Sequence, residues 1–208
     1  MSFFQLLIFT ELLKYNLYFS GVRVGQAFLK TEQISDTVSK GVLLIRTEGF
    51  FDKIYSVRDS LVSYFHSQLF YTLRYERYIS EAGYNSVSIA EYRGDTVFYH
   101  DGSKIPLHSK AFDPISVIYF IRSRPTLDTL YNLLFHVGKV STEVQVRVSR
   151  TQDREFLWRI YIDLRSPKKS KVPGETIYYL ASFGSRPPVR LEFKSNYGAF
   201  VAKLKEME

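Results

Sequence analysis

A small set of polar and aromatic residues stands in or beside segments that otherwise look buried, and these are the candidates for chemistry: Arg58, Asp59, Asp113, Tyr119, Arg122 and Trp158. A buried charge needs a partner, because desolvation is costly. In a structural interpretation, Asp113 caps a helix and Arg58 or Arg122 pairs with Asp59. In a functional one, Tyr119 and Arg122 face a cavity that binds an apolar ligand with an anionic head. Trp158 would line such a cavity or belong to the core.

The sequence contains no recognisable catalytic or metal-binding motif. The chain has no cysteine, which excludes disulfides and thiolate zinc sites. Its four histidines show no paired-ligand spacing, so we expect no metal and no cofactor, and we expect the histidines to be partly exposed strand and loop residues. His100 and Asp101 precede Gly102, which favours a turn over acid/base work. A serine nucleophile elbow is also missing. We therefore do not expect an enzyme.

Alternation of apolar and polar residues dominates the chain and predicts half-buried strands. It is clearest in the segments 13–20, 143–148, 156–165 and 189–194, and weaker in 87–89. Glycines separate these segments at intervals typical of hairpins, as at Ser20-Gly21, Ala82-Gly83 and Val137-Gly138. Strands joined by such tight turns must be antiparallel, because parallel pairs need long crossovers. The pattern predicts a meander of about ten to twelve strands.

One segment predicts a buried helix from about Pro114 to Arg122. Asp113 is a suitable N-cap, Pro114 suits the first helical position, and apolar residues then occupy nearly every side. Pro125 would end the helix. We expect the sheet to curl around this helix as a meander or an open barrel, which gives a mainly β fold class. A second, shorter helical turn is expected at residues 50–55.

Length and composition favour one β-rich domain over residues 1–208. The net charge is +7, and the excess of basic residues lies mostly after residue 138. These residues are mostly spaced singly along strands, which favours a basic soluble face over a site for nucleic acid or for an anionic membrane surface, with peripheral membrane contact left open. No stretch approaches the ~20 apolar residues that a membrane-spanning helix needs. Residues 1–12 fit either a signal-peptide remnant without a basic n-region or a first strand.

Four segments together resemble the bacterial domain-of-unknown-function family 3108. Leu13–Ala27 is similar to an opening hairpin with glycines at Gly21 and Gly25, and Tyr55–Ser60 is a short second match. Phe112–Arg122 matches the family's Asp-Pro, Ser, Tyr, Arg segment and is the most specific. Arg186–Lys194 with the final strand to Leu204 completes the order.

The resemblance implies an exported, periplasmic protein of the cell envelope, although the N-terminus shows no clear signal peptide. By analogy of fold, a curled sheet around a helix resembles the periplasmic lipoprotein carriers. We therefore expect a non-catalytic protein that binds a lipid, an acyl chain, a lipoprotein or an envelope partner in the concavity of the sheet. A structural or scaffolding protein with a filled core is the alternative, and an enzyme acting on envelope glycans or lipids is a third hypothesis.

Overall fold

The structure is a computed structural model, and it describes residues 10–123, 129–150, 158–163, 176–181, 187–195 and 198–208. Eight strands precede the crossing between the two halves of the chain: β1 (Thr10–Phe19), β2 (Val22–Gln33), β3 (Val38–Thr47), β4 (Arg58–His66), β5 (Thr72–Glu81), β6 (Tyr84–Arg93), β7 (Thr96–Tyr99) and β8 (Lys104–Pro106). Seven follow: β9 (Ala111–Phe112), β10 (Leu130–Val137), β11 (Val140–Arg150), β12 (Trp158–Asp163), β13 (Thr176–Ala181), β14 (Pro188–Ser195) and β15 (Gly198–Met207). The two helices found in the described residues are α1 (Gly49–Ile54) and α2 (Ser116–Ser123).

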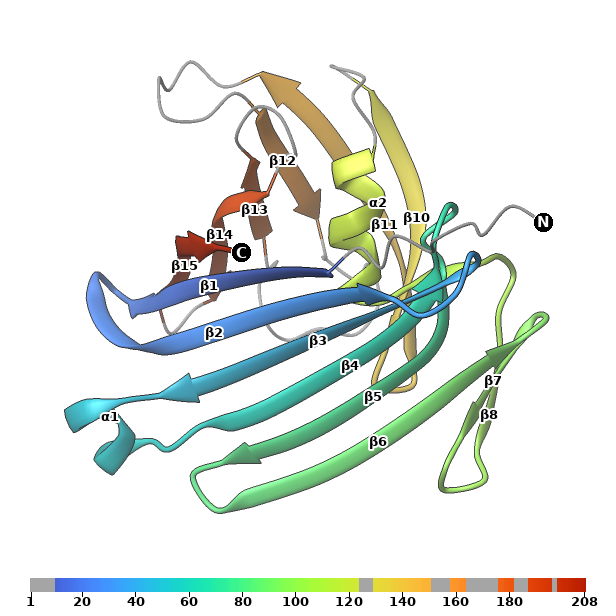
Figure 1. The fold of residues 1–208 in the computed structure, drawn as a ribbon. Helices are drawn as coiled ribbons and strands as arrows, with labels where there is room; N and C mark the ends of the chain where they lie inside the picture. Colours follow the sequence, from blue (N-terminus) through green and yellow to red (C-terminus); the bar gives the residue numbers. More distant parts are fainter. Residues whose placement is uncertain (1–9, 124–128, 151–157, 164–175, 182–186, 196–197) are drawn as a thin grey trace, which may run out of the picture.

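All the described strands belong to one sheet, which consists of two limbs joined at β1 (Figure 1). Strands β1 to β8 form the first limb by successive antiparallel pairing, and β10 to β15 form the second in the same way. Strand β15 then pairs antiparallel with β1, with Leu13 opposite Met207. The chain passes between the limbs through β9 and α2, so the helix lies on the crossover connection.

The predicted mainly β fold class and curled meander are confirmed. The sheet has fifteen strands in the described residues instead of ten to twelve, because β7, β8 and β9 are too short to show alternation in the sequence. Strands β9 and β10 pair in parallel over two residues. The predicted second helical turn is confirmed as α1. Of residues 1–12, Thr10 to Leu12 belong to β1, and residues 1–9 lie outside the described residues.

The predicted hairpin turns are confirmed at their glycines. Ser20 and Gly21 have φ angles of 46° and 88°, and Ala82 and Gly83 have 44° and 88°. Two successive residues in the left-handed region give the turn a twist that matches the strands on either side. The local sequence therefore determines where β1 turns into β2 and where β5 turns into β6.

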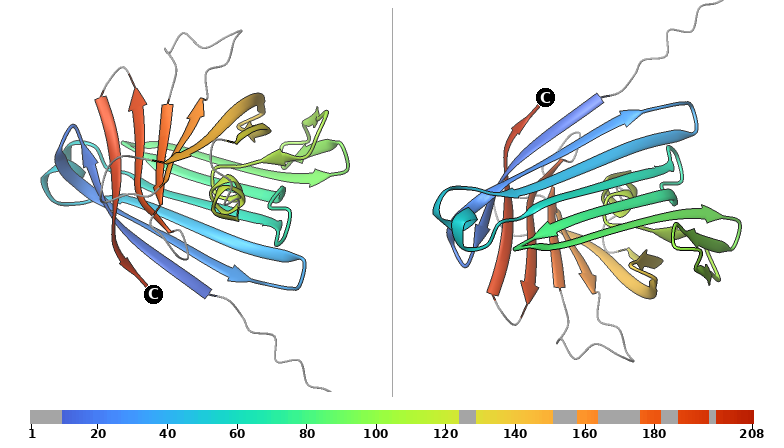
Figure 2. Two further views of the ribbon diagram at one scale, coloured as in Figure 1. Left: turned by 90° about the horizontal axis from the view of Figure 1, so that it is seen from above. Right: turned by 90° about the horizontal axis from the view of Figure 1, so that it is seen from below.

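Helix α2 lies in the concave side of the sheet, between the two limbs (Figure 2). Val117, Phe120 and Ile121 pack in one cluster with side chains of β9, β10 and β11. Ile115 and Tyr119 pack in a second cluster with side chains of β1, β2 and β4. A helix that contacts a sheet on two sides must be apolar nearly all round, which explains its sequence.

Gly41 in β3 allows the start of α2 to approach the sheet closely. A Cβ atom placed on Gly41 would lie 2.5 Å from Cγ2 of Ile115. Ile115 is fully buried, so it has no free space into which it could move. The absence of a side chain at residue 41 therefore sets the distance between β3 and the helix.

We predict that Gly41→Ala lowers the free energy of unfolding by about 1–3 kcal/mol, because the added methyl group overpacks the interface with Ile115. The measurement is a urea denaturation followed by circular dichroism, carried out on Gly41→Ala, Ile115→Ala and the double variant. The two changes should be non-additive, since Ile115→Ala removes the atom that clashes. Additive losses would show that Gly41 is required for another reason.

Candidate functional site

Asp113 caps the start of α2, as predicted. One of its carboxylate oxygens, Oδ1, accepts hydrogen bonds from the backbone N–H groups of Ile115 at 2.7 Å and Ser116 at 3.0 Å. In return, the backbone N–H of Asp113 donates to Oγ of Ser116 at 2.9 Å. This reciprocal arrangement is a capping box, and Pro114 occupies the first helical position, where no donor is needed.

The second carboxylate oxygen of Asp113 fastens the helix start to the sheet. Ser63 Oγ of β4 donates to Oδ2 at 2.5 Å, and Thr72 Oγ1 of β5 donates to it at 2.7 Å. Asp113 is wholly buried, and its burial raises the pKa of the carboxyl group, while the four donors act in the opposite direction. Asp113 therefore holds α2 to two neighbouring strands.

Arg122 and Glu11 form a buried ion pair at the other end of α2. The guanidinium Nη1 and Nη2 atoms donate to Oε2 and Oε1 of Glu11, both at 2.6 Å. Only 9% of the Arg122 side chain and 6% of the Glu11 side chain are exposed. A bidentate pair of this kind is strong and directional, since both charges are satisfied by hydrogen bonds. It holds the end of α2 to β1.

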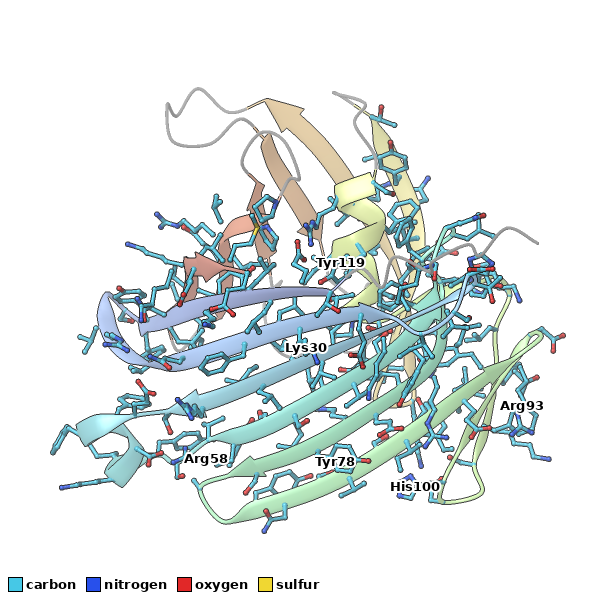
Figure 3. The ribbon with its side chains drawn as sticks, viewed as in Figure 1. Lys30, Arg58, Tyr78, Arg93, His100 and Tyr119 are labelled. Carbon is cyan, nitrogen blue, oxygen red and sulfur yellow. The ribbon has the colours of Figure 1, made fainter. Side chains whose placement is uncertain are left out.

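Tyr119 lies inside the same polar cluster (Figure 3). Its hydroxyl group forms hydrogen bonds with Thr31 Oγ1 of β2 and with Glu11 Oε2, the latter at 3.3 Å. Its ring stacks on Phe65 with a centroid distance of 5.4 Å, and the Arg122 guanidinium lies 5.0 Å from the ring centroid. Burial raises the pKa of Tyr119, so the phenol stays protonated. The two residues predicted to meet a ligand thus meet each other and Glu11.

The predicted ion pair between Asp59 and Arg58 or Arg122 is wrong. Arg58 donates two hydrogen bonds of 2.8 Å to Asp52 of α1, and Arg122 binds Glu11. Asp59 lies on the concave face of β4, and its side chain accepts the backbone N–H of Ser80 at 3.0 Å. Alternation along β4 puts the side chains of Arg58 and Asp59 on opposite faces of the sheet, so Arg58 does not pair with Asp59.

The environment of Asp59 makes it unusual among the candidate residues. Partial burial raises its pKa to about 6, and the neighbouring Glu81 carboxyl group adds to this effect. The shift comes from loss of solvent and from a like charge, without an ordered catalytic partner among the described residues. Asp59 is brought together with none of the other predicted site residues.

A buried histidine joins the edges of the two limbs, at a place that we call the seam. His136 of β10 is fully buried, which contradicts the expectation of partly exposed histidines. The Tyr99 hydroxyl of β7 lies 2.7 Å from its Nε2 atom, and the Ser141 hydroxyl lies 2.7 Å from Nδ1. Because the backbone N–H of Lys139 donates to Tyr99 at 2.9 Å, the Tyr99 hydrogen is free to donate to Nε2.

The seam is completed by further contacts between the limbs. The Tyr92 hydroxyl of β6 donates to the His136 carbonyl oxygen at 3.2 Å, and Lys139 pairs with Asp101. A third apolar cluster, which includes Val97, Leu107 and Leu134, packs beneath. Burial lowers the pKa of His136 to about 4, so the ring is neutral at physiological pH.

A pocket of about 180 Å³ opens at this seam. Its lining mixes polar and apolar surface, includes one ammonium group, and consists of Tyr71, Thr72, Leu73, Tyr92, Gly94, Leu107, Lys110 and Ala111. The Lys110 ammonium group lies 5.2 Å from the ring centroid of Tyr71. None of the five predicted ligand-binding residues whose side chains the structure describes lines this pocket.

Trp158 begins β12, but its side chain lies outside the described part of the structure. Within the described residues, no group of three or more side chains gathers that could hold a metal ion. Neither described helix is long and apolar enough to cross a membrane.

The sequence reasoning did not identify the partners Glu11, Ser63 and His136. The alternation of residues along the strands predicts that two of them point inward, since Glu11 shares a strand face with Leu13, and Ser63 shares one with Phe65. His136 similarly follows Leu134 on the inner face of β10. Glu11 lies within residues 1–12, for which the sequence fits a signal remnant as well as a first strand.

Comparisons with known proteins agree with this fold. The model of a family described as "Protein of unknown function (DUF3108)" matches residues 14–205. The chain is similar to the crystal structure of a beta-barrel-like protein of domain of unknown function DUF1849 from Brucella abortus, with a TM-score of 0.67 and 8% sequence identity. That match covers 96% of this chain and 97% of the other, and it indicates a shared fold. A search of curated proteins found no match.

We predict that Arg122→Met lowers the free energy of unfolding by about 3–5 kcal/mol, because it leaves the Glu11 carboxylate buried without a cation. The double variant Glu11→Gln/Arg122→Met should recover much of the loss, since no unpaired charge remains. Urea denaturation provides the measurement. Arg58→Met is the matched control and should change stability little, because the Arg58–Asp52 pair is exposed. Equal losses in both arginine variants would contradict the assignment.

We also predict an acid-sensitive contribution from His136. Its pKa is about 4 in the folded chain and 6.5 in the unfolded chain, so its contribution to stability is complete above pH 6.5 and is lost as the pH falls toward 4. The loss should be about 2–3 kcal/mol. Urea denaturation at pH 7.5 and 4.5 should show a smaller pH effect for His136→Gln than for the wild type. The exposed His100→Gln is the control and should behave as the wild type does.

Proposed function

We propose, from the premise that this chain belongs to the DUF3108 family, that it is a non-catalytic binding protein of the bacterial cell envelope. In this proposal the protein is periplasmic and holds an apolar or amphiphilic ligand, such as a lipid, an acyl chain or a lipoprotein, on the concave side of its sheet. The observation that carries the proposal is the pocket at the seam, where aromatic and aliphatic side chains lie beside the ammonium group of Lys110.

The lining of the pocket suits an amphiphile. Tyr71, Tyr92 and Leu107 offer apolar and aromatic surface, and Lys110 offers a positive charge beside them. A carboxylate or phosphate head would bind the ammonium group, while the adjoining carbons would contact the rings. A volume of about 180 Å³ is below the range typical of sites for drug-sized ligands, so it accommodates only a part of a lipid.

The seam provides a way to admit a longer chain. In the described residues, the limbs meet there through side chains and single hydrogen bonds, not through a ladder of backbone hydrogen bonds between β7 and β10. Separating the limbs at this place would leave the Asp113 cap and the Glu11–Arg122 pair intact. The interior could therefore widen beside α2 without the loss of the helix anchors.

The predicted ligand role of Tyr119 and Arg122 would require a different event. An anionic head would have to displace the Glu11 carboxylate, which already occupies both donors of the guanidinium fork. This closed cluster is the specific observation that favours the second candidate function, a structural or scaffolding protein with a filled core. The two functions differ in whether an amphiphile binds saturably.

The test is a titration of the full chain with a fluorescent C18 fatty acid. We predict saturable binding, and we predict that Lys110→Glu weakens it about tenfold, the equivalent of about 1.4 kcal/mol, because the ammonium partner of the carboxylate is replaced by a like charge. Lys104→Glu in β8 is the matched control, since it makes the same change of charge on an exposed residue outside the pocket.

The outcomes separate the candidates. Loss of affinity in Lys110→Glu alone would support a site at the seam. Equal losses in both lysine variants would indicate general electrostatic attraction instead of a site. No saturable binding to the wild-type chain would contradict the carrier proposal and favour the scaffolding function.

A further inference from the structure

The β1–β2 hairpin lies beside α1 at one end of the molecule (Figures 1 and 2), and both carry apolar side chains that are exposed to solvent. The exposed fractions are 77% for Phe50, 64% for Ile54 and 66% for Val22, and Phe200 of β15 is also exposed. We call these four residues the apolar tip. Phe50 and Ile54 are four residues apart in α1 and therefore share one face of this helix.

The apolar tip is held by a rigid base. The ring centroid of Phe19 lies 4.6 Å from that of Phe200 and 6.4 Å from that of Phe51, which links the hairpin, β15 and α1. Asp52 of α1 accepts two hydrogen bonds from Arg58 and one of 2.6 Å from Thr47. The polar side of α1 is thus bound to the sheet, and Phe50 projects away from it.

Folding of this chain alone does not explain the sequence of α1. None of its residues is buried, although three of its six residues are Phe or Ile. A short helix that exposes large apolar residues lowers the solubility of the protein unless another surface covers those residues. The shape also matters, because the apolar tip is an end that protrudes and not a groove that would receive a side chain.

Basic residues outnumber acidic ones in the two segments that carry most of the apolar tip. Residues 19–23 and 46–58 contain four basic side chains against two acidic ones. Arg23 and Arg46 are each about half exposed and share one carboxylate, Glu48, at 3.3 and 3.4 Å. Lys53 is also exposed, on α1 itself. Exposed apolar residues with long cationic side chains nearby match the chemistry of an anionic lipid surface.

We propose that the apolar tip docks the protein on anionic lipid surfaces, with Phe50 and Ile54 entering the apolar layer and Arg23, Arg46 and Lys53 binding the lipid phosphates. This contact is peripheral and separate from the pocket at the seam, so it does not rest on the proposed function. It places the hairpin and α1 at the lipid surface, with the seam at a different part of the fold.

The experiment is flotation of the full chain with vesicles of pure phosphatidylcholine or of phosphatidylcholine and phosphatidylglycerol in equal parts. We expect the wild type to float with the anionic vesicles, and we expect less at high salt, because screening weakens the attraction. Phe50→Ser/Ile54→Ser should reduce the bound fraction at least fivefold. Leu44→Ser/Val87→Ser is the matched control: both residues are exposed on the sheet, away from the apolar tip, and binding should be unchanged.

Three outcomes would overturn the proposal. In the first, the wild type fails to float with anionic vesicles. In the second, both double variants lose binding equally, which would show that the apolar tip is not specific. In the third, Phe50→Ser/Ile54→Ser abolishes a dimer seen by sedimentation and leaves vesicle binding intact, which would assign the apolar tip to a second copy of this chain. Circular dichroism of each variant verifies that it is folded.

Discussion

The bidentate pair of Arg122 and Glu11 is the interaction on which the arrangement of the two limbs depends. Its charges come from the end of α2 and from β1, the strand at which the limbs join. Because α2 lies on the connection between the two limbs, its position determines where the second limb begins. The pair is almost fully removed from solvent, so a displaced helix would leave two unpaired buried charges. That penalty selects one position of α2.

The anchors at the two ends of α2 have complementary roles. Between them the helix is apolar on two sides, and apolar contacts alone specify rotation about the helix axis only weakly. Asp113 fixes the start through hydroxyl groups of β4 and β5, and Arg122 fixes the end through β1. Gly41 of β3 determines how closely the start of the helix approaches the sheet. Directional polar contacts thus give a non-directional apolar core its single arrangement.

The sequence predicts well those features that depend on neighbouring residues. Alternation identified the strands, glycines identified the turns, and the Asp113-Pro114 pair identified the start of the helix, because each is a property of a few consecutive residues. The sequence did not predict the contacts whose two partners are far apart along the chain. Arg122 and Glu11 are 111 residues apart, and they meet only because α2 packs against β1 in the folded chain. His136 was missed although alternation placed it inward, since burial of a histidine requires Tyr99 from the other limb.

The distribution of satisfied and exposed groups favours binding at the margins of this fold over binding at its centre. The polar groups beside α2 already have partners within the chain, so a ligand there would first have to displace Glu11. Lys110 at the seam makes a long hydrogen bond of 3.4 Å to the Gly94 carbonyl oxygen and contacts the Tyr71 ring, and Phe50 at the apolar tip faces solvent. A group with few or weak contacts in its own chain gains more from a new contact than a group that must first lose a strong one. Among the described residues, this difference is the reason for placing both proposals at the margins of the fold.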